Sequence, residues 1–257
     1  MIDAHAHLWR IGRNGCTWPP PELAAIHRDF ELAELRQVCS ADQVILVQSQ
    51  EDIADTDWLL SVADDPFVAG VVGWADLAMP DPFPDHPKLL GLRPMVQDRE
   101  AGWFDAPALE AGLAAMGRRG LVLDALVRPR HLPALDRVAA RHPELAIVVD
   151  HAAKPEAGRL DDWAKDMQVL ADHPNVSCKL SGLLTEMSPE ETEPVFALLW
   201  SAFGPARLIW GSDWPVLTLA ARYDQWLALA RRLVPGAHHP AVFDAKSRRI
   251  YRLERAA

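Results

Sequence analysis

The segment Leu145-Ala146-Ile147-Val148-Val149-Asp150-His151 carries the clearest indication of fold class in this chain of 257 residues. Five apolar residues follow one another without interruption, and two ionisable side chains stand directly after them. Continuous apolar runs are typical of strands in a parallel sheet, where neighbouring layers bury both faces. Val44-Ile45-Leu46-Val47 is a second run of this kind. Both segments therefore predict strands of a parallel sheet.

Runs rich in β-forming residues occur eight times along the chain, and segments with helical spacing separate most of them. Alternating strands and helices predict βα units, and eight such units predict a closed (β/α)₈ or TIM barrel. The length agrees, because a TIM barrel needs about 250 residues. We find no linker and no low-complexity tract, so we expect one α/β domain over residues 1–257. The predicted strands are Ile2–His5, Gln43–Val47, Val68–Trp74, Leu89–Pro94, Gly120–Ala125, Leu145–Asp150, Val176–Leu180 and Arg207–Gly211.

The segments between the predicted strands are mostly helical in their spacing. Met79–Lys88 is the exception, because its prolines prevent a long helix, and we expect an irregular connection there. The long segment Leu8–Phe30 follows the first strand, and a loop of that kind commonly covers an active site. The predicted helices are Leu32–Cys39, Asp57–Ala63, Ala106–Arg118, Leu132–Arg141, Leu160–Ala171 and Pro189–Phe203.

The formal net charge of −10 at pH 7 argues against a nucleic-acid partner, because phosphate backbones bind basic surfaces. We expect a small-molecule partner instead, and the sequence leaves a homo-oligomer open. Cys16, Cys39 and Cys178 form no CxxC pair, which is typical of a reducing compartment rather than a disulfide framework. We find no signal peptide and no apolar run long enough for a bilayer. We therefore expect a cytoplasmic protein that does not interact with membranes.

Polar side chains gather at the carboxyl ends of the predicted strands, where TIM barrels place their catalytic groups. An ordinary barrel does not need so many ionisable groups at one end, so this pattern predicts an active site. The residues at these ends are His5, His7, Gln48, Trp74, Asp76, Arg93, Asp124, Asp150, His151, Lys179, Ser181, Ser212 and Asp213.

His5 and His7 are the first candidates for chemistry, because residues two apart on a strand point the same way. Two converging imidazoles can hold a metal ion or donate a hydrogen bond to a carbonyl group. A His-x-His pair alone is a weak signal, but His151 and Asp213 stand at other strand ends. Asp213 is a candidate general base for water, and the alternative is a helix N-cap.

Arg93 and Lys179 are the candidate contacts for an anion or a carbonyl group. The fork of an arginine side chain suits a carboxylate or a lactone carbonyl. A buried cation is costly unless it is paired, so Lys179 has an equally supported alternative, which is a structural ion pair with Asp150 or Asp124.

Several motifs, taken together and in this order, resemble the amidohydrolase 2 family, the lactonase-type branch of the amidohydrolase superfamily. The resemblance runs from the first predicted strand to the last and covers nearly the whole chain. The combination is specific, although no single motif is. The motifs are Ile2-Asp3-Ala4-His5-Ala6-His7-Leu8-Trp9, Val47-Gln48, Val71-Val72-Gly73-Trp74-Ala75-Asp76-Leu77, Gly91-Leu92-Arg93, Asp150-His151-Ala152-Ala153-Lys154-Pro155, Cys178-Lys179-Leu180-Ser181-Gly182-Leu183 and Trp210-Gly211-Ser212-Asp213-Trp214-Pro215-Val216.

The resemblance implies a distorted TIM barrel that hydrolyses lactones, either sugar-acid lactones or carboxylated lactones such as 2-pyrone-4,6-dicarboxylate. It implies that His5, His7 and His151 polarise the lactone carbonyl and that Asp213 deprotonates the attacking water. It also implies that this mouth of the barrel binds the substrate. The expected substrate contacts are Arg93, Lys179, Gln48, Trp74, Asp76, Trp9 and Trp214.

The resemblance leaves the cofactor open between no metal and one Zn²⁺. A binuclear site would need a carboxylated Lys or a Glu and further histidines, and Asp124 stands where a histidine is expected. We favour hydrolysis without a metal, and the alternative is one Zn²⁺ held by His5, His7 and Asp213, with or without His151.

The sequence departs from the family pattern at two places. Pro94 follows Arg93 where many relatives carry a histidine, so any substrate contact made by that histidine is lost. Asp244-Ala245-Lys246-Ser247 replaces a Gly-x-Asn-Ala turn near the C-terminus, which affects only the closing helix.

Three other functions compete with a lactonase. A zinc-dependent decarboxylase would release CO₂ instead of a ring-opened acid. A metal-dependent nuclease or other hydrolase of the superfamily would need more metal ligands and, for a nuclease, a basic groove. A binding barrel without activity would not need the full acid–base set.

Overall fold

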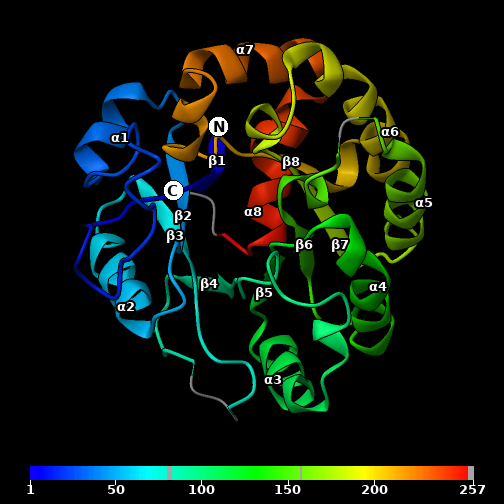
Figure 1. Cartoon of the computed structure of the whole chain (residues 1–257), viewed down its shortest axis with the longest axis horizontal. Coiled ribbons are helices and arrows are strands. Elements are labelled where there is room, and N and C mark those ends of the chain that lie inside the picture. The colour runs from blue at the N-terminus through cyan, green and yellow to red at the C-terminus, as the bar shows by residue number, and fades with distance from the viewer. Residues whose placement is uncertain (80–82, 157, 254–257) are drawn as a thin grey trace.

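The computed structural model describes residues 1–79, 83–156 and 158–253. Its eight strands form one sheet in the order of the sequence, and all neighbouring pairs are parallel. The barrel that the strand count predicted is therefore confirmed (Figure 1). The strands are β1 (Ile2–Ala6), β2 (Gln43–Val47), β3 (Val68–Gly73), β4 (Leu89–Leu92), β5 (Val122–Ala125), β6 (Ile147–Val149), β7 (Val176–Leu180) and β8 (Leu208–Trp210).

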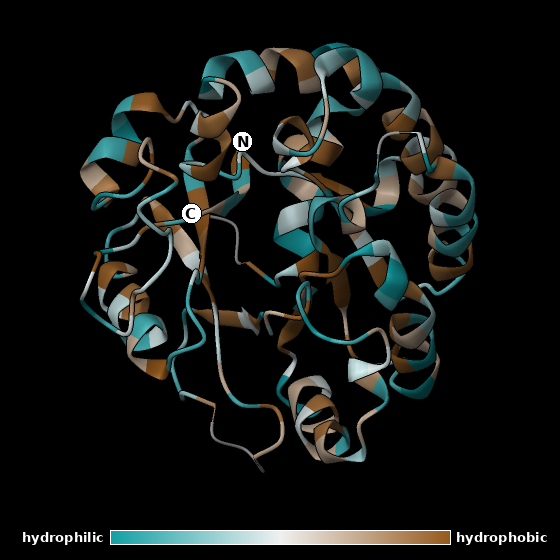
Figure 2. Ribbon diagram, viewed as in Figure 1, coloured by the Kyte–Doolittle hydropathy of each residue, from teal (hydrophilic) through white to brown (hydrophobic). Residues whose placement is uncertain are grey.

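A ring of helices surrounds the strands, as Figure 1 shows. In Figure 2 the strands are mostly hydrophobic, whereas the helices carry both hydrophobic and hydrophilic residues. This is the pattern of a barrel whose strands are buried on both faces. No helix of the described residues is long and apolar enough to cross a membrane. The helices are α1 (Leu32–Val38), α2 (Ile53–Val62), α3 (Glu110–Arg119), α4 (Leu132–Arg141), α5 (Leu160–Ala171), α6 (Pro189–Arg207), α7 (Tyr223–Leu233) and α8 (Lys246–Ile250).

Several predicted boundaries need correction. β3, β4, β5, β6 and β8 are shorter than predicted, and β1 is one residue longer. The residues left out lie in turns or irregular connections, except Arg207, which ends α6. α2 begins at Ile53, since the Asp52 carboxylate caps it by accepting a hydrogen bond from the Ala54 N–H at 2.8 Å. The predicted helix 106–118 is a 3₁₀ turn over Pro107–Leu109 followed by α3. In the predicted connection Met79–Lys88, residues 80–82 lie outside the described part, and the described remainder contains no helix.

Strand β1 contains one extra residue between the pairs Asp3–Val44 and Ala6–Leu46. Ile2 and Ala4 pack inside the barrel with the apolar residues of the other strands, whereas Ala6 packs in the outer core. In a regular strand that starts this way, His5 would point outward. The bulge reverses the alternation, as bulges do, and turns His5 into the barrel.

The barrel closes between β1 and the end of β8. The His7 N–H donates to the Trp214 carbonyl oxygen at 2.7 Å, and the Asp213 N–H donates to the His5 carbonyl oxygen at 2.8 Å. Ala6 and Trp214 also form a parallel bridge. Closure therefore brings the beginning of the chain against residues from its last fifth.

Candidate active site

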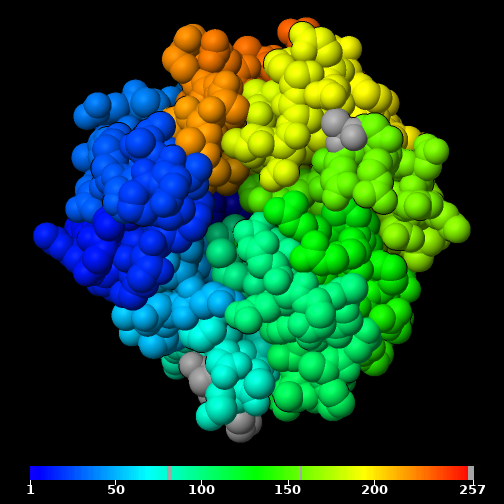
Figure 3. Space-filling view, viewed as in Figure 1, coloured from blue at the N-terminus to red at the C-terminus, as the bar shows by residue number. Residues whose placement is uncertain are grey.

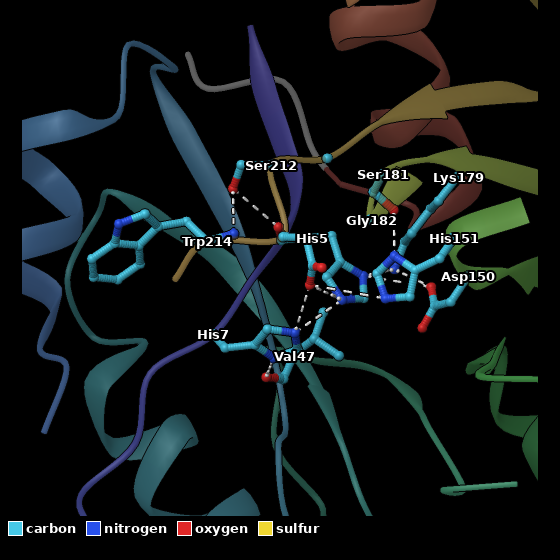
Figure 4. Close-up of polar contacts among 12 residues, drawn as sticks. His5, His7, Val47, Asp150, His151, Lys179, Ser181, Gly182, Ser212 and Trp214 are labelled. Atoms are coloured by element: carbon cyan, nitrogen blue, oxygen red, sulfur yellow. Dashed lines mark hydrogen bonds and ion pairs between the residues drawn. The ribbon is translucent and has the colours of Figure 1, made fainter. Parts of the chain in front are cut away.

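Four side chains predicted from the strand ends meet at one point of the barrel mouth. Figure 4 labels three of them, His5, His7 and His151. The Asp213 Oδ1 atom lies 3.3 Å from His7 Nε2, 3.7 Å from His5 Nε2 and 3.9 Å from His151 Nε2. His5 Nε2 and His7 Nε2 are 3.1 Å apart. All four side chains are buried. We call His5, His7, His151 and Asp213 the open cluster, because three of them line a cavity described below.

The orientation of His7 follows from a backbone contact. Its Nδ1 atom lies 2.8 Å from the carbonyl oxygen of Val47, which can only accept a hydrogen bond. The proton of a neutral His7 therefore sits on Nδ1, and the Nε2 lone pair faces the Asp213 carboxylate. Burial lowers the pKa of His7, although the nearby Asp213 carboxylate opposes this by favouring the protonated imidazole. A lone pair that faces a carboxylate is the arrangement of a site that holds a cation or a shared proton.

Asp213 stands on a strained turn with φ of 61°, in the left-handed region that residues other than glycine rarely adopt. Its backbone is held there by the hydrogen bond to His5 that closes the barrel. Burial by itself raises the pKa of Asp213, but the neighbouring imidazoles, His151 first and then His7, outweigh it and bring the pKa below its ordinary value. Asp213 is thus a carboxylate near neutral pH, as a general base for water must be.

His151 lies in a left-handed turn, with φ of 51°, directly after β6. Its Nδ1 atom lies 2.9 Å from the Ser181 hydroxyl oxygen, which fixes the direction of the ring. A Cβ atom at Gly182 would lie 2.4 Å from the same Nδ1, so only glycine fits beside this ring. Burial lowers the pKa of His151 to about 4, so its imidazole is neutral at pH 7.

A second group of buried polar residues contacts His5, and Figure 4 labels two of them, Lys179 and Asp150. Lys179 Nζ is 3.0 Å from His5 Nδ1 and 3.0 Å from the Asp150 carboxylate, and it also donates to Asp124. The Tyr251 hydroxyl donates to Asp124 at 2.8 Å from the opposite side. We call Lys179, Asp124, Asp150 and Tyr251 the sealed network, because all four are buried and none lines the cavity.

The charges of the sealed network compensate one another. Burial raises the pKa of Asp124 to about 6, although Lys179 opposes this. Burial also acts to raise the pKa of Asp150, but Lys179 and His5 outweigh it and hold that pKa well below the ordinary value. Burial and then the Lys179 charge keep the pKa of His5 well below its ordinary value. Lys179 is therefore the structural ion pair that was one of its two predicted roles.

Arg93 contacts the open cluster, the sealed network and the backbone that follows β2. Its Nη1 atom lies 3.5 Å from Asp150 and 3.4 Å from His5 Nε2, and Nη2 donates to the Gln48 carbonyl oxygen. The Gln48 amide returns a hydrogen bond to the Arg93 carbonyl oxygen at 2.7 Å. The Arg93 Nε atom is buried without a partner, so this guanidinium keeps one donor unused.

A cavity of about 520 Å³ opens above the open cluster. Figure 3 shows a hollow near the centre of one face, with atoms of the N-terminal part of the chain at its base. The cavity is lined by residues that follow seven of the eight strands. They are His7, Gly15, Thr17, Trp18, Ser49, Gln50, Glu51, Asp52, Arg93, Met95, Gln97, Asp98, Arg99, Leu126, His151, Lys154, Gly182, Thr185, Asp213 and Val216.

The structure brings only Arg93 of the seven predicted substrate contacts to this cavity. Lys179 belongs to the sealed network, and Gln48 is buried behind Arg93. Trp9 is fully buried and donates to the Arg28 carbonyl oxygen, while Trp214 is buried and packs on Phe30. Trp74 and Asp76 do not line the cavity either. Residue type had selected Trp9 and Trp214, but the loops that carry them turn their rings into the core.

The residues of the open cluster fit a single divalent metal ion. His5, His7 and Asp213 offer ligand atoms that all lie within 4.8 Å of one another, and His5, Asp150 and His151 form a second such group. Imidazole nitrogens and a carboxylate oxygen are the ligands that Zn²⁺ binds in catalytic sites. The Asp150 carboxylate lies 3.5 Å from His5 Nδ1, so it can accept a hydrogen bond from that nitrogen when Nε2 is a metal ligand.

Comparisons with known proteins agree with this geometry. A family model described as Amidohydrolase matches residues 2–253. An L-fucono-1,5-lactonase from Burkholderia ambifaria is 44% identical, over 99% of this chain and 96% of the relative. An L-fucono-1,5-lactonase from Burkholderia multivorans is 32% identical, over 100% of this chain and 97% of the relative. A crystal structure of an amidohydrolase from Burkholderia multivorans with bound zinc has a TM-score of 0.92 at 32% identity, covering 98% of this chain and 99% of that one.

Proposed function

Because the chain belongs to the amidohydrolase family, in the branch called amidohydrolase 2, we propose that it is a lactonase that hydrolyses a sugar-acid lactone. The proposal rests on one observation above all: a buried carboxylate and three imidazoles meet at the base of a cavity. The full-length similarity to two L-fucono-1,5-lactonases supports the same reaction and suggests the same substrate class.

In the proposed reaction, Asp213 accepts a proton from a water molecule. The water oxygen then forms a bond with the carbonyl carbon, and the bond from that carbon to the ring oxygen breaks. The ring oxygen takes up the proton that Asp213 received and leaves as a hydroxyl group, so the product is an open-chain hydroxy acid. Asp213 suits the first step because its carboxylate is ionised and faces the cavity.

The histidines and Arg93 stabilise the charge that develops on the carbonyl oxygen. His151 is neutral and lines the cavity, and Ser181 holds its ring in place. Arg93 lines the same cavity with a buried nitrogen that has no partner. Fixed donors in a water-poor site stabilise an oxyanion strongly, because they need not reorganise during the reaction.

A divalent metal ion would be held by His5, His7 and Asp213, with His151 beside it. When bound, such an ion polarises a carbonyl group and lowers the pKa of water. We propose Zn²⁺ as this ion, since the similar amidohydrolase from Burkholderia multivorans has been crystallised with zinc. This replaces the metal-independent reaction that we favoured from the sequence.

The charges of the cavity favour an uncharged lactone over a carboxylated one. Each of the three cations in the lining has a carboxylate partner. Arg93 pairs with Asp150 at 3.5 Å, Arg99 with Glu51 at 2.8 Å, and Lys154 with Glu186 at 3.2 Å. A dicarboxylate would have to compete with these partners and would also face Asp52 and Asp98. A neutral, hydroxylated ring neither competes with these carboxylates for the cations nor is repelled by Asp52 and Asp98.

A panel of lactones tests the proposal. The purified protein is incubated with L-fucono-1,5-lactone, other sugar-acid lactones and 2-pyrone-4,6-dicarboxylate, and a pH indicator follows acid release. Parallel samples contain a chelator, followed by Zn²⁺ addition. We expect the sugar-acid lactones to be hydrolysed faster than the dicarboxylate and the chelator to lower the rate reversibly.

Two results would contradict the proposal. If the dicarboxylate is the best substrate, the substrate class is wrong. If no lactone is opened and CO₂ is released from an aromatic acid instead, the protein is a decarboxylase of the same superfamily.

A further inference from the structure

Besides residues of the open cluster, the cavity is lined by an aromatic ring and by an amide whose oxygen has no hydrogen-bond partner. From these we infer that Trp18 and Gln97 recognise the hydroxylated part of the lactone ring and that Gln50 positions Trp18. The inference rests on the proposed function and deepens it, because it assigns a subsite that selects sugar lactones over plain ones.

Trp18 is the one tryptophan, tyrosine or phenylalanine among the described residues that line the cavity. It lies in the long loop after β1 and packs edge-on against Trp9 with ring centroids 5.2 Å apart. Trp9 is fully buried, and its ring packs on Phe30 in turn. Trp18 thus presents an indole to the cavity from a supported position.

Gln50 holds the backbone of Trp18 with every polar atom of its side chain. Its Oε1 accepts from the Thr17 N–H at 3.2 Å and from the Trp18 N–H at 3.3 Å. Its Nε2 donates to the Trp18 carbonyl oxygen at 3.0 Å and to the Ser49 hydroxyl at 3.1 Å. An amide used in this way has little capacity left for a substrate, so Gln50 acts as a positioning residue.

Gln97 is the opposite case. It lines the same cavity, but its Oε1 atom is buried and has no hydrogen-bond partner. Its backbone is anchored, since Arg130 donates to the Gln97 carbonyl oxygen at 2.6 Å. A buried acceptor without a donor is unfavourable, and a ligand that supplies the donor removes that cost.

Together these two residues match a polyhydroxylated ring. The C–H groups of a sugar lactone pack against an indole face, and a ring hydroxyl can donate to the amide oxygen. A lactone without hydroxyl groups can pack on the indole but has no hydroxyl to donate to the amide oxygen. The subsite therefore discriminates by substrate hydroxylation, whereas the open cluster acts on the lactone bond that both substrates share.

The test compares two substrates of equal ring size, L-fucono-1,5-lactone and δ-valerolactone, in Trp18→Leu and Gln97→Leu. We expect kcat/KM for the sugar lactone to fall by roughly tenfold in each variant, mainly through KM. For δ-valerolactone, Gln97→Leu should leave kcat/KM within about twofold of the wild-type value. Gln50→Glu, which removes the donor to the Trp18 carbonyl, should resemble Trp18→Leu.

Trp58→Leu and Gln168→Leu serve as matched controls, because neither residue lines the cavity, and both should leave the substrate ratio unchanged. Trp18→Phe, with a smaller ring, gives an intermediate loss and replaces Trp18→Leu if that variant unfolds. Equal losses for both substrates, or no loss for either, would overturn the inference. A wild-type protein that opens no lactone would instead overturn the proposed function itself.

Discussion

Two buried polar groups meet at His5, and they differ in how their charges are satisfied. In the sealed network, Lys179 stands between two carboxylates and the Tyr251 hydroxyl completes the coordination of Asp124. In the open cluster, the lone pair of His7 faces the Asp213 carboxylate, and the cavity is adjacent. The charges of the sealed network are paired within the chain, whereas the open cluster can be completed by a cation or a substrate.

The difference teaches which buried charges contribute to folding and which to chemistry. A buried ion pair lowers the stability of the fold strongly when one of its two partners is removed. A buried ionised group whose neighbours provide no counter-charge is expected at a reactive site. We therefore expect substitutions in the open cluster to lower activity at nearly constant stability, and substitutions in the sealed network to do the reverse.

The largest effect is expected for Asp213→Asn. The amide cannot accept the proton of water and is a poorer metal ligand, so kcat/KM should fall by about a thousandfold or more. Steady-state hydrolysis of L-fucono-1,5-lactone measures this loss, and a denaturation curve should show nearly constant stability. Asp98→Asn, on the same cavity, is the control and should retain most activity. Wild-type turnover in Asp213→Asn would rule out the proposed base.

The next effect is on stability and concerns Lys179→Met. Its loss leaves Asp124 and Asp150 buried beside each other without their shared cation, which should cost about 3–5 kcal/mol. Urea denaturation measures the free energy of unfolding. Adding Asp124→Asn to this variant should recover part of the loss, because one buried charge is then removed. A Lys179→Met protein as stable as the wild type would contradict the structural role assigned to the sealed network.

Asp55 is a third buried carboxylate, and it forms no ion pair among the described residues. It accepts a hydrogen bond from the Ser49 N–H at 3.2 Å, while its other oxygen has no partner. Burial raises the pKa of Asp55 to about 7. A carboxyl with a raised pKa in the folded state contributes stability below its ordinary pKa, and this contribution is lost as the pH rises through 7.

Asp55→Asn cannot ionise and escapes that loss. The stability of the variant relative to the wild type should therefore rise by a few kcal/mol between pH 4 and pH 8, a window that spans the pKa of about 7. Denaturation curves at several pH values measure the difference. A difference that stays flat over this window would contradict the prediction and show that Asp55 is already charged at low pH.

The smallest effect is expected for Ser181→Ala. The change removes the hydroxyl that lies against His151 Nδ1, and the ring then loses its fixed direction. Loss of such a supporting contact typically lowers activity by about tenfold. The reduction should appear in kcat more than in KM, since Ser181 does not line the cavity. An unchanged kcat would show that Gly182 packing alone orients His151.

Much of the fold and the reacting centre could be predicted from the sequence. β2, β7, α4 and α5 have the predicted bounds, because continuous apolar runs and helical spacing are local signals. The rule that barrel strands carry function at their carboxyl ends brought together His5, His7, His151 and Asp213, and the structure places them around one point.

The remaining features depend on geometry that spacing does not show. The inward direction of His5 requires the bulge in β1, and no residue of that strand marks it. Trp18, Gln50 and Gln97 line the cavity only because loops far apart in sequence fold over the barrel mouth. The same loops bury Trp9 and Trp214, which residue type alone had suggested as contacts.

The closing hydrogen bonds between β1 and the end of β8 have a consequence for divided chains. His5 and His7 come from the start of the chain and Asp213 from near its end, so each fragment of a barrel cut between them holds an incomplete reacting centre. Lactone turnover by two co-expressed fragments would report their complementation directly. Lactone hydrolysis by this protein therefore requires that the barrel be closed.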